Sequence, residues 1–174
     1  ALGLIVPGGI RLAAAAVLLL LAACGGSRLQ APPRLAIPPF ENLTGDSSLD
    51  WLGHAATEVL AHGLAGRPSF RVSRVASRRE AVGAGAGRVL HGYIATHNGR
   101  LRIRAAMEDL ASNRMLHTYA LDGPLRDGIL PLAAALAREI DPQARPFPTK
   151  NAQALQAYVK ARTSPHADAA KLYE

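Results

Sequence analysis

The chain is 174 residues long, and its 20 lysines and arginines outnumber its 13 aspartates and glutamates, which gives a net charge of +7. It has a single cysteine, which excludes an intramolecular disulfide and with it a small disulfide-stabilised fold. The length is sufficient for one compact domain with a hydrophobic core and a short appendage.

The chain begins with an apolar stretch that has the features of a secretory signal. Residues 12–23 carry no polar side chain and follow Arg11. A run of this length is too short to cross a bilayer core, which needs about 20 residues. The run ends in Leu21, Ala22, Ala23 and Cys24. This ending resembles the lipobox of bacterial lipoproteins, so we expect cleavage before Cys24 and acylation of its thiol, with palmitate among the acyl chains.

Two alternatives stay open for this segment. Cys24 is a buried or free thiol if the protein is an ordinary secreted one. Residues 1–23 form a retained, uncut membrane anchor if no peptidase acts on them, although Arg11 and the Pro7-Gly8-Gly9 break argue against a continuous span. The sequence starts with Ala1, so we also expect that the natural start lies elsewhere.

The lipobox resemblance implies a lipid-anchored protein of the bacterial cell envelope that faces the periplasm, with the outer membrane as the expected location. Removal of residues 1–23 takes away Arg11 and no acidic residue, so the mature chain keeps a net charge of +6. In the periplasm a basic protein meets anionic lipid headgroups, lipopolysaccharide phosphates or an acidic protein partner rather than nucleic acid. The alternative is a solvated arginine-rich surface.

The chain after the signal divides by composition into a tether (24–33), a domain (34–141), a proline-rich linker (142–150) and a C-terminal helical pair (151–174). In the domain, residues 35–40 form an apolar run that predicts a strand, and the break by Pro38-Pro39 within the run favours an edge or terminating strand. Residues 42–48 predict a loop. Apolar residues at three- and four-residue spacing then predict a helix over 49–64, capped by Asp46 or Ser47.

The rest of the domain predicts further strands and helices. Residues 70–75 form a strand, 77–82 a short helix, and the glycine-rich 83–87 a flexible connector rather than a phosphate-binding loop. Three antiparallel strands follow over 89–96, 101–109 and 115–121, with Asn98-Gly99 as a tight hairpin turn. A helix covers 129–140. We therefore expect an α/β (α+β) fold with a mixed sheet, an antiparallel three-strand block and helices packed on it.

The periodicity also predicts which side chains are buried and which are candidate contacts. The expected core comprises Leu52, Val59, Leu60, Leu101, Ile103, Met107 and Leu136. Strand alternation directs Arg71, Arg102 and Arg104 away from their apolar neighbours, so they would share one sheet face if their strands are neighbours. These arginines are candidate contacts for an anion or a protein partner. A solubility role is the alternative.

Residues 35–46, Leu-Ala-Ile-Pro-Pro-Phe-Glu-Asn-Leu-Thr-Gly-Asp, followed by an amphipathic helix, resemble the opening of the TolB amino-terminal-like domain. Residues 70–72, 89–93 and 101–103 stand in the right order for the later strands of that family. In residues 152–162, Leu155, Tyr158 and Ala161 lie along one side, and with 167–174 they resemble the start of a tetratricopeptide repeat. The resemblance implies a binding domain rather than an enzyme, of the kind found in lipoproteins that regulate peptidoglycan synthases or assist assembly of envelope structures.

No reaction class can be assembled from the side chains. The six histidines form no ligand pair at helical spacing beside an acid, and no serine has a nucleophile-elbow context. We therefore expect no catalytic residue, no metal site and no cofactor. Two hypotheses remain: a non-enzymatic lipoprotein that docks an envelope protein through the first helix, the 42–48 loop or the C-terminal helices, or an unrecognised periplasmic hydrolase.

Overall fold

The computed structural model describes residues 32–163. The lipobox, Cys24, residues 24–31 of the tether and the predicted helix 167–174 lie outside the described residues. The strands are β1 (Arg34–Ile37), β2 (Glu41–Asn42), β3 (Arg71–Arg74), β4 (Arg88–His97), β5 (Arg100–Asp109) and β6 (Arg114–Pro124). The helices are η1 (Ser47–Leu49), α2 (Trp51–Leu64), α3 (Arg78–Gly83), η2 (Leu125–Asp127), α4 (Ile129–Ile140) and α5 (Ala152–Thr163).

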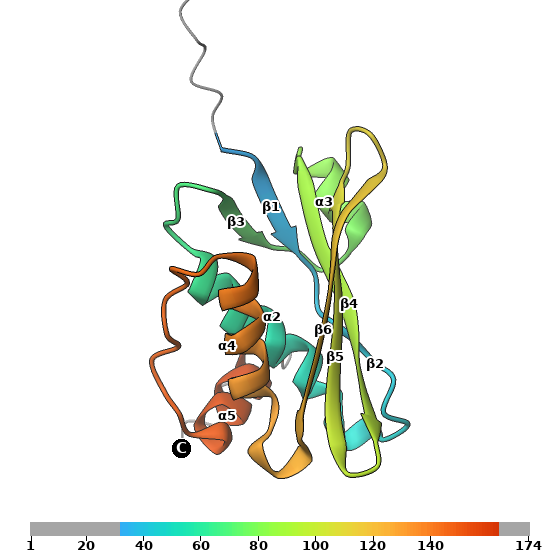
Figure 1. Cartoon of the computed structure of the whole chain (residues 1–174), viewed down its shortest axis with the longest axis vertical. Helices are drawn as coiled ribbons and strands as arrows, with labels where there is room; N and C mark the ends of the chain where they lie inside the picture. The colour runs from blue at the N-terminus through green and yellow to red at the C-terminus, as the bar shows by residue number, and fades with distance from the viewer. Residues whose placement is uncertain (1–31, 164–174) are drawn as a thin grey trace, which may run out of the picture. The chain divides into compact units, whose positions relative to one another are not determined.

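These elements form one mixed sheet with helices packed on it, which confirms the predicted α/β (α+β) class (Figure 1). The strand order is β3-β1-β4-β5-β6, and the short β2 pairs with β4. β4, β5 and β6 are antiparallel in the predicted order. Asn98 and Gly99 both have positive φ, 49° and 69°, as the predicted hairpin turn requires.

The expectation that the first strand lies at an edge is wrong. β1 pairs in parallel with both β3 and β4 and is therefore interior. Its residues Leu35 to Ile37 are fully buried. Pro38 and Pro39 follow the last residue of the strand, so their missing N–H groups remove no hydrogen bond from its ladder.

The core lies between one face of the sheet and the helices α2 and α4. All seven residues predicted to be buried are at most 3% exposed and belong to one hydrophobic cluster. α2 approaches the chain after β1 closely: the Phe40 N–H donates to the Gly53 carbonyl at 3.3 Å, and the Thr57 hydroxyl donates to the Pro38 carbonyl at 2.9 Å. These contacts fix α2 beneath the sheet.

A smaller cluster lies on the opposite face, under α3. It joins Ala36 of β1, Val89 of β4 and Ala81 of α3, with Val75 and Ala86 beside them. Ser77 caps the start of α3, and its hydroxyl accepts the Glu80 N–H at 3.2 Å. The predicted short helix is therefore present, and it covers the sheet only where β1 and β4 begin.

The C-terminal helix packs on the same core. Residues 142–150 contain no helix or strand, and α5 then lies against α2, with Leu155 and Val159 each 1% exposed in the main cluster. The predicted apolar side of this helix is corrected, because Tyr158 is 44% exposed while Val159 is buried. Among residues 32–163, no helix has the length and hydropathy needed to cross a membrane.

Candidate functional site

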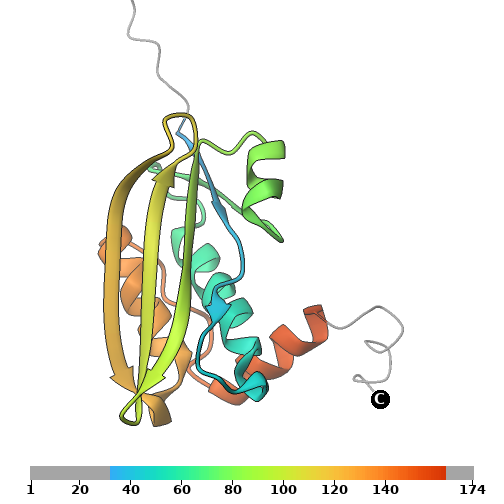
Figure 2. The ribbon, with the colours of Figure 1, turned by 90° about the vertical axis from the view of Figure 1, so that its right-hand side faces the viewer.

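Beyond the start of β4, where α3 packs, one face of the β4–β6 block is left uncovered by the described helices. Figure 2 shows α2 and α4 behind these strands and no described helix in front of them. The register places alternate residues of each strand on this side: His91 and Tyr93 from β4, Arg102, Arg104 and Ala106 from β5, and Thr118, Ala120 and Asp122 from β6. We call this surface the open face.

The centre of the open face is hollowed by small side chains. A depression of about 290 Å³ is lined by His91, Tyr93, Arg104, Ala106, Thr118 and Ala120, together with neighbouring backbone. Gly92 contributes to the close strand pairing beneath it, because a Cβ there would stand 2.0 Å from the carbonyl oxygen of Arg104. Among the lining side chains Tyr93 is an exposed aromatic, with 37% of its surface accessible. The depression can therefore receive a protruding side chain from a partner.

The arginines give this face its charge. Arg102 Nε donates to Asp122 Oδ1 at 2.6 Å. This hydrogen bond raises the pKa of Arg102 and lowers the pKa of Asp122. Arg104 lies two pairs along the ladder, between Tyr93 and Ala120, where it adds to the lowering of the Asp122 pKa. Arg100 also lowers the pKa of Asp122, so this one carboxylate faces three guanidinium groups.

Arg71 is not part of this group. It lies on the same face of the sheet, but β3 is separated from β5 by β1 and β4. Along the strands, Arg71 lies one row beyond the row of Arg88, Asp109 and Arg114, and Arg104 and Arg102 are five and seven residues from Asp109 in the opposite direction. At about 3.4 Å per residue this is roughly 17–24 Å. The structure brings Arg102 and Arg104 together and leaves Arg71 at the other end of the sheet.

A second polar cluster lies where the open face meets α3. Arg78 Nη2 donates to Glu108 Oε1 at 2.5 Å, and His91 Nε2 lies 3.7 Å from Glu108 Oε2. The hydrogen bond from Arg78 lowers the pKa of Glu108 despite its partial burial. Glu108 is therefore already paired with Arg78, which holds α3 against the strands, while His91 Nε2 forms no hydrogen bond within residues 32–163.

The sequence also predicts partner contacts for the first helix and the 42–48 loop, and the two differ in how much of their side-chain surface is exposed to solvent. α2 is buried over most of its length and exposes fully only His54. The 42–48 loop is closed by its own hydrogen bonds, since Asn42 Nδ2 donates to Asp50 Oδ1 at 2.6 Å and the Thr44 N–H donates to Asn42 Oδ1 at 3.0 Å. Leu43 at its tip is 56% exposed. The residues that carry the family resemblance thus shape this loop.

A groove of about 500 Å³ lies between α2, the 142–150 segment and α5. Glu58 at its wall accepts from Arg74 at 3.1 Å and lies 3.6 Å from Arg162. His62 contacts the ring of Phe147 edge-on, with ring centres 5.4 Å apart, so its position is explained by packing. This groove is the contact surface that the C-terminal helix offers.

Within residues 32–163, no group of three or more His, Cys, Asp or Glu side chains is placed to hold a metal ion. The polar partners on the open face that sequence reasoning missed are Tyr93, His91 and Asp122. Alternation alone places Tyr93 and His91 on the same side of β4. Asp122 required the register between β5 and β6, which no local pattern contains.

No protein-family model and no curated protein matches the sequence. Among solved structures, a point variant of the PelC dodecamer from Paraburkholderia phytofirmans is similar, with 18% identity over 67% of this chain and 93% of PelC, and a TM-score of 0.50. The LpoB C-terminal domain from Salmonella enterica (14% identity, 61% and 93% covered, TM-score 0.43) and TolB from Acinetobacter baumannii (17%, 64% and 29%, TM-score 0.40) are less similar. The structure of residues 32–163 thus has the fold of PelC, and the tetratricopeptide resemblance stays a prediction.

Proposed function

We propose that the chain is a non-enzymatic lipoprotein of the bacterial cell envelope, held by acylated Cys24 and facing the periplasm, whose domain docks a protein through the open face. The observation that carries this proposal is the uncovered side of the β4–β6 block, with its depression and exposed Tyr93. The opposite side of the same strands packs on α2 and α4. An exposed aromatic beside a depression and an arginine is the composition typical of binding hot spots.

The charge of the open face selects the chemistry of the partner. β5 places Arg100, Arg102 and Arg104 on this side, against Asp122 of β6, while Glu108 is already bonded to Arg78. An acidic protein surface with a protruding apolar side chain fits both the charge and the depression. Such a partner would be steered to the face, and its association would slow as salt is raised.

One structural neighbour suggests a competing occupant of the open face. PelC is described as a dodecamer, so a second copy of this chain is a competing occupant. The finer function, regulation of peptidoglycan synthesis or assembly of an envelope structure, follows from the identity of the protein bound. The expected outer-membrane location is likewise part of this proposal and is tested by fractionation of the two membranes.

The docking test compares two tyrosines of similar exposure. A photo-crosslinker at Thr118 identifies the partner in envelope membranes, and the dissociation constant is then measured with purified proteins. Tyr93→Ala and Arg104→Glu are expected to weaken binding at least tenfold. Tyr158→Ala on α5, which is 44% exposed, is the matched control and should bind normally. Equal binding by all three folded variants would refute docking through the open face. Light scattering of the purified chain detects self-association.

The anchor is tested separately with Cys24→Ser. Since Cys24 is the chain's one cysteine, the variant has no thiol to acylate and is expected to leave the membrane pellet. A variant that stays uncut and membrane-bound would show that residues 1–23 are a retained anchor instead.

A further inference from the structure

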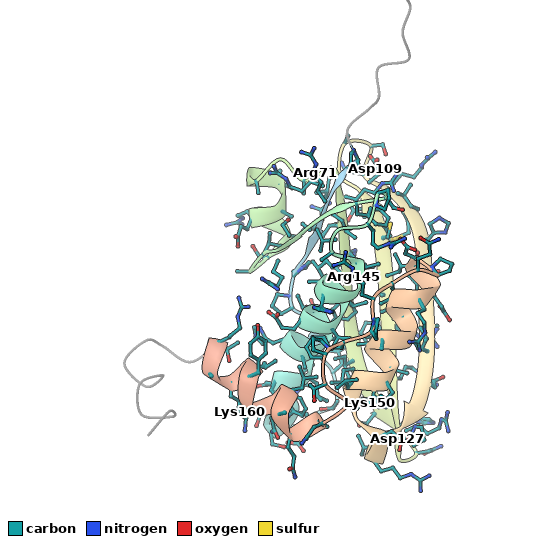
Figure 3. All side chains as sticks on the ribbon, turned by 90° about the vertical axis from the view of Figure 1, so that its left-hand side faces the viewer. Arg71, Asp109, Asp127, Arg145, Lys150 and Lys160 are labelled. Carbon is teal, nitrogen blue, oxygen red and sulfur yellow. The ribbon has the colours of Figure 1, made fainter. Side chains whose placement is uncertain are left out.

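One end of the sheet carries an arginine at the start of four strands, β1, β3, β4 and β6. Arg34 pairs in register with Arg71, and the next row joins Arg88, Asp109 and Arg114 across β4, β5 and β6. α3 packs on the start of β1 and β4 and adds two more arginines. We call these six residues the arginine end: Arg34, Arg71, Arg78, Arg79, Arg88 and Arg114. Figure 3 shows Arg71 and Asp109 at this end, with Asp127 and Lys150 at the other.

The carboxylates near the arginine end are already engaged within the domain. Glu108 accepts from Arg78, and Asp109 Oδ1 accepts the N–H and hydroxyl of Ser112 at 2.9 and 2.8 Å. Glu80 Oε2 accepts the Ala76 N–H at 2.6 Å. These three carboxylates face six arginines, so the end remains positive.

Within residues 32–163, three of the six arginines are not engaged by another polar or charged group. Arg34 donates to the Ala84 carbonyl, and the guanidinium of Arg88 lies 5.8 Å from the centre of the Phe70 ring. In contrast, the side chains of Arg71, Arg79 and Arg114 are exposed and form no hydrogen bond or ion pair among residues 32–163. Their charges are therefore available to an outside anion.

The arginine end is also where the described chain begins. The Arg71 N–H donates to the Pro33 carbonyl at 3.1 Å, which places residue 33 beside the first residue of β3. Eight residue steps separate Cys24 from Pro32, a span of at most about 29 Å when fully extended. β5 alone, ten residues long, extends about 34 Å from this end. An anchor at Cys24 therefore keeps the arginine end near the bilayer and leaves the opposite end free to stand away from it.

We propose that the arginine end binds the anionic headgroups of the membrane that holds the chain. The inference rests on the proposed function, because the acyl anchor at Cys24 brings this end to the bilayer. Attraction between the guanidinium groups and the headgroups acts over about 8 Å at physiological salt, so it orients the domain only when the tether already holds it close. β4, β5 and β6 then stand upright on the membrane, and the open face stays accessible to a protein partner.

The test uses the acylated chain in vesicles of phosphatidylcholine, alone or mixed with phosphatidylglycerol. Acylation consumes the thiol of Cys24, so a fluorophore can be attached at Ala111→Cys in the β5–β6 turn or at His97→Cys at the other end of β4. A quencher carried by the lipid is expected to quench the label at 111 and not at 97 in anionic vesicles. Salt near 1 M should remove the difference, since the Debye length falls to about 3 Å.

Two triple variants with equal loss of charge complete the design. Arg71, Arg79 and Arg114→Gln should lower the local binding constant on the order of a hundredfold and abolish selective quenching at 111. The control, Arg126, Lys150 and Lys160→Gln, removes three exposed charges elsewhere and should quench normally. Equal loss in both variants, or equal quenching at 97 and 111, would overturn the orientation. Flotation with vesicles measures attachment through the acyl anchor and is recorded separately. A chain that floats without selective quenching at 111 refutes only this inference. A chain that fails to float with neutral vesicles refutes the anchor and the inference together.

Discussion

Gly53→Ala should destabilise the domain, although glycine to alanine normally stabilises a helix. Gly53 lies near the start of α2, where a Cβ atom would stand 2.0 Å from the carbonyl oxygen of Phe40. That oxygen belongs to the backbone, and the Phe40 N–H donates to the Gly53 carbonyl, so relief requires a shift of about 1 Å in a hydrogen-bonded segment. Overpacking costs up to about 3 kcal/mol, against about 1 kcal/mol gained from helix propensity. The expected net loss is about 2 kcal/mol.

The assay is urea unfolding followed by circular dichroism, with thermal melting beside it. A loss of about 2 kcal/mol lowers the melting temperature by roughly 4–8 °C in a chain of this size. Gly83→Ala in α3 is the matched control, because nothing lies within 4 Å of a Cβ there. It should be neutral or stabilise by up to about 1 kcal/mol. A Gly53→Ala protein as stable as the parent would refute the backbone contact as the reason for glycine.

Three further outcomes are expected. Ile103→Ala, at a fully buried position, should cost about 2–5 kcal/mol in urea unfolding, and unchanged stability would refute the register of β5. Leu155→Ala should lower the single melting transition of the domain, because α5 packs on α2; a separate early transition would show that α5 unfolds independently. The N–H of Gln143, and then Arg67, hold the pKa of Asp141 below its usual value, so this carboxylate stabilises the fold above about pH 4 and loses the effect as pH falls. Asp141→Asn should therefore flatten the acid dependence of the melting temperature, and an unchanged slope would refute the assignment.

The antiparallel block could be predicted from sequence because its information is local. Alternation along 101–109 specifies which side of β5 is buried, and Asn98-Gly99 specifies the turn that sets the register with β4. Helix periodicity likewise placed α2 and α4. Each of these features depends on residues within a few positions of one another.

What sequence could not supply is the arrangement of distant segments. β1 reads as an edge strand because prolines follow it, yet its position between β3 and β4 depends on two parallel crossovers. Strand alternation predicts the sheet face of Arg71 correctly, but Arg71 lies on β3, which is not a neighbour of β5. The predicted group of three arginines is therefore divided into Arg71 and the pair Arg102 and Arg104. Tyr158 and Val159 are adjacent in α5, and only the crossing with α2 decides that Val159 is the buried one.

Part of this sheet is covered by helices on both faces, and part is covered on one face only. The change occurs within β4. At its start, Val89 is buried by α3 on one side while Leu90 is buried by the main core on the other. Four residues further, Tyr93 occupies the same side as Val89 and is exposed. Parallel strands are normally buried on both faces, and antiparallel strands can leave one face in water. The open face therefore begins where the cover by α3 stops, at the pair that Glu108 forms with Arg78, the first residue of α3. A partner bound there would touch α3 as well as the strands.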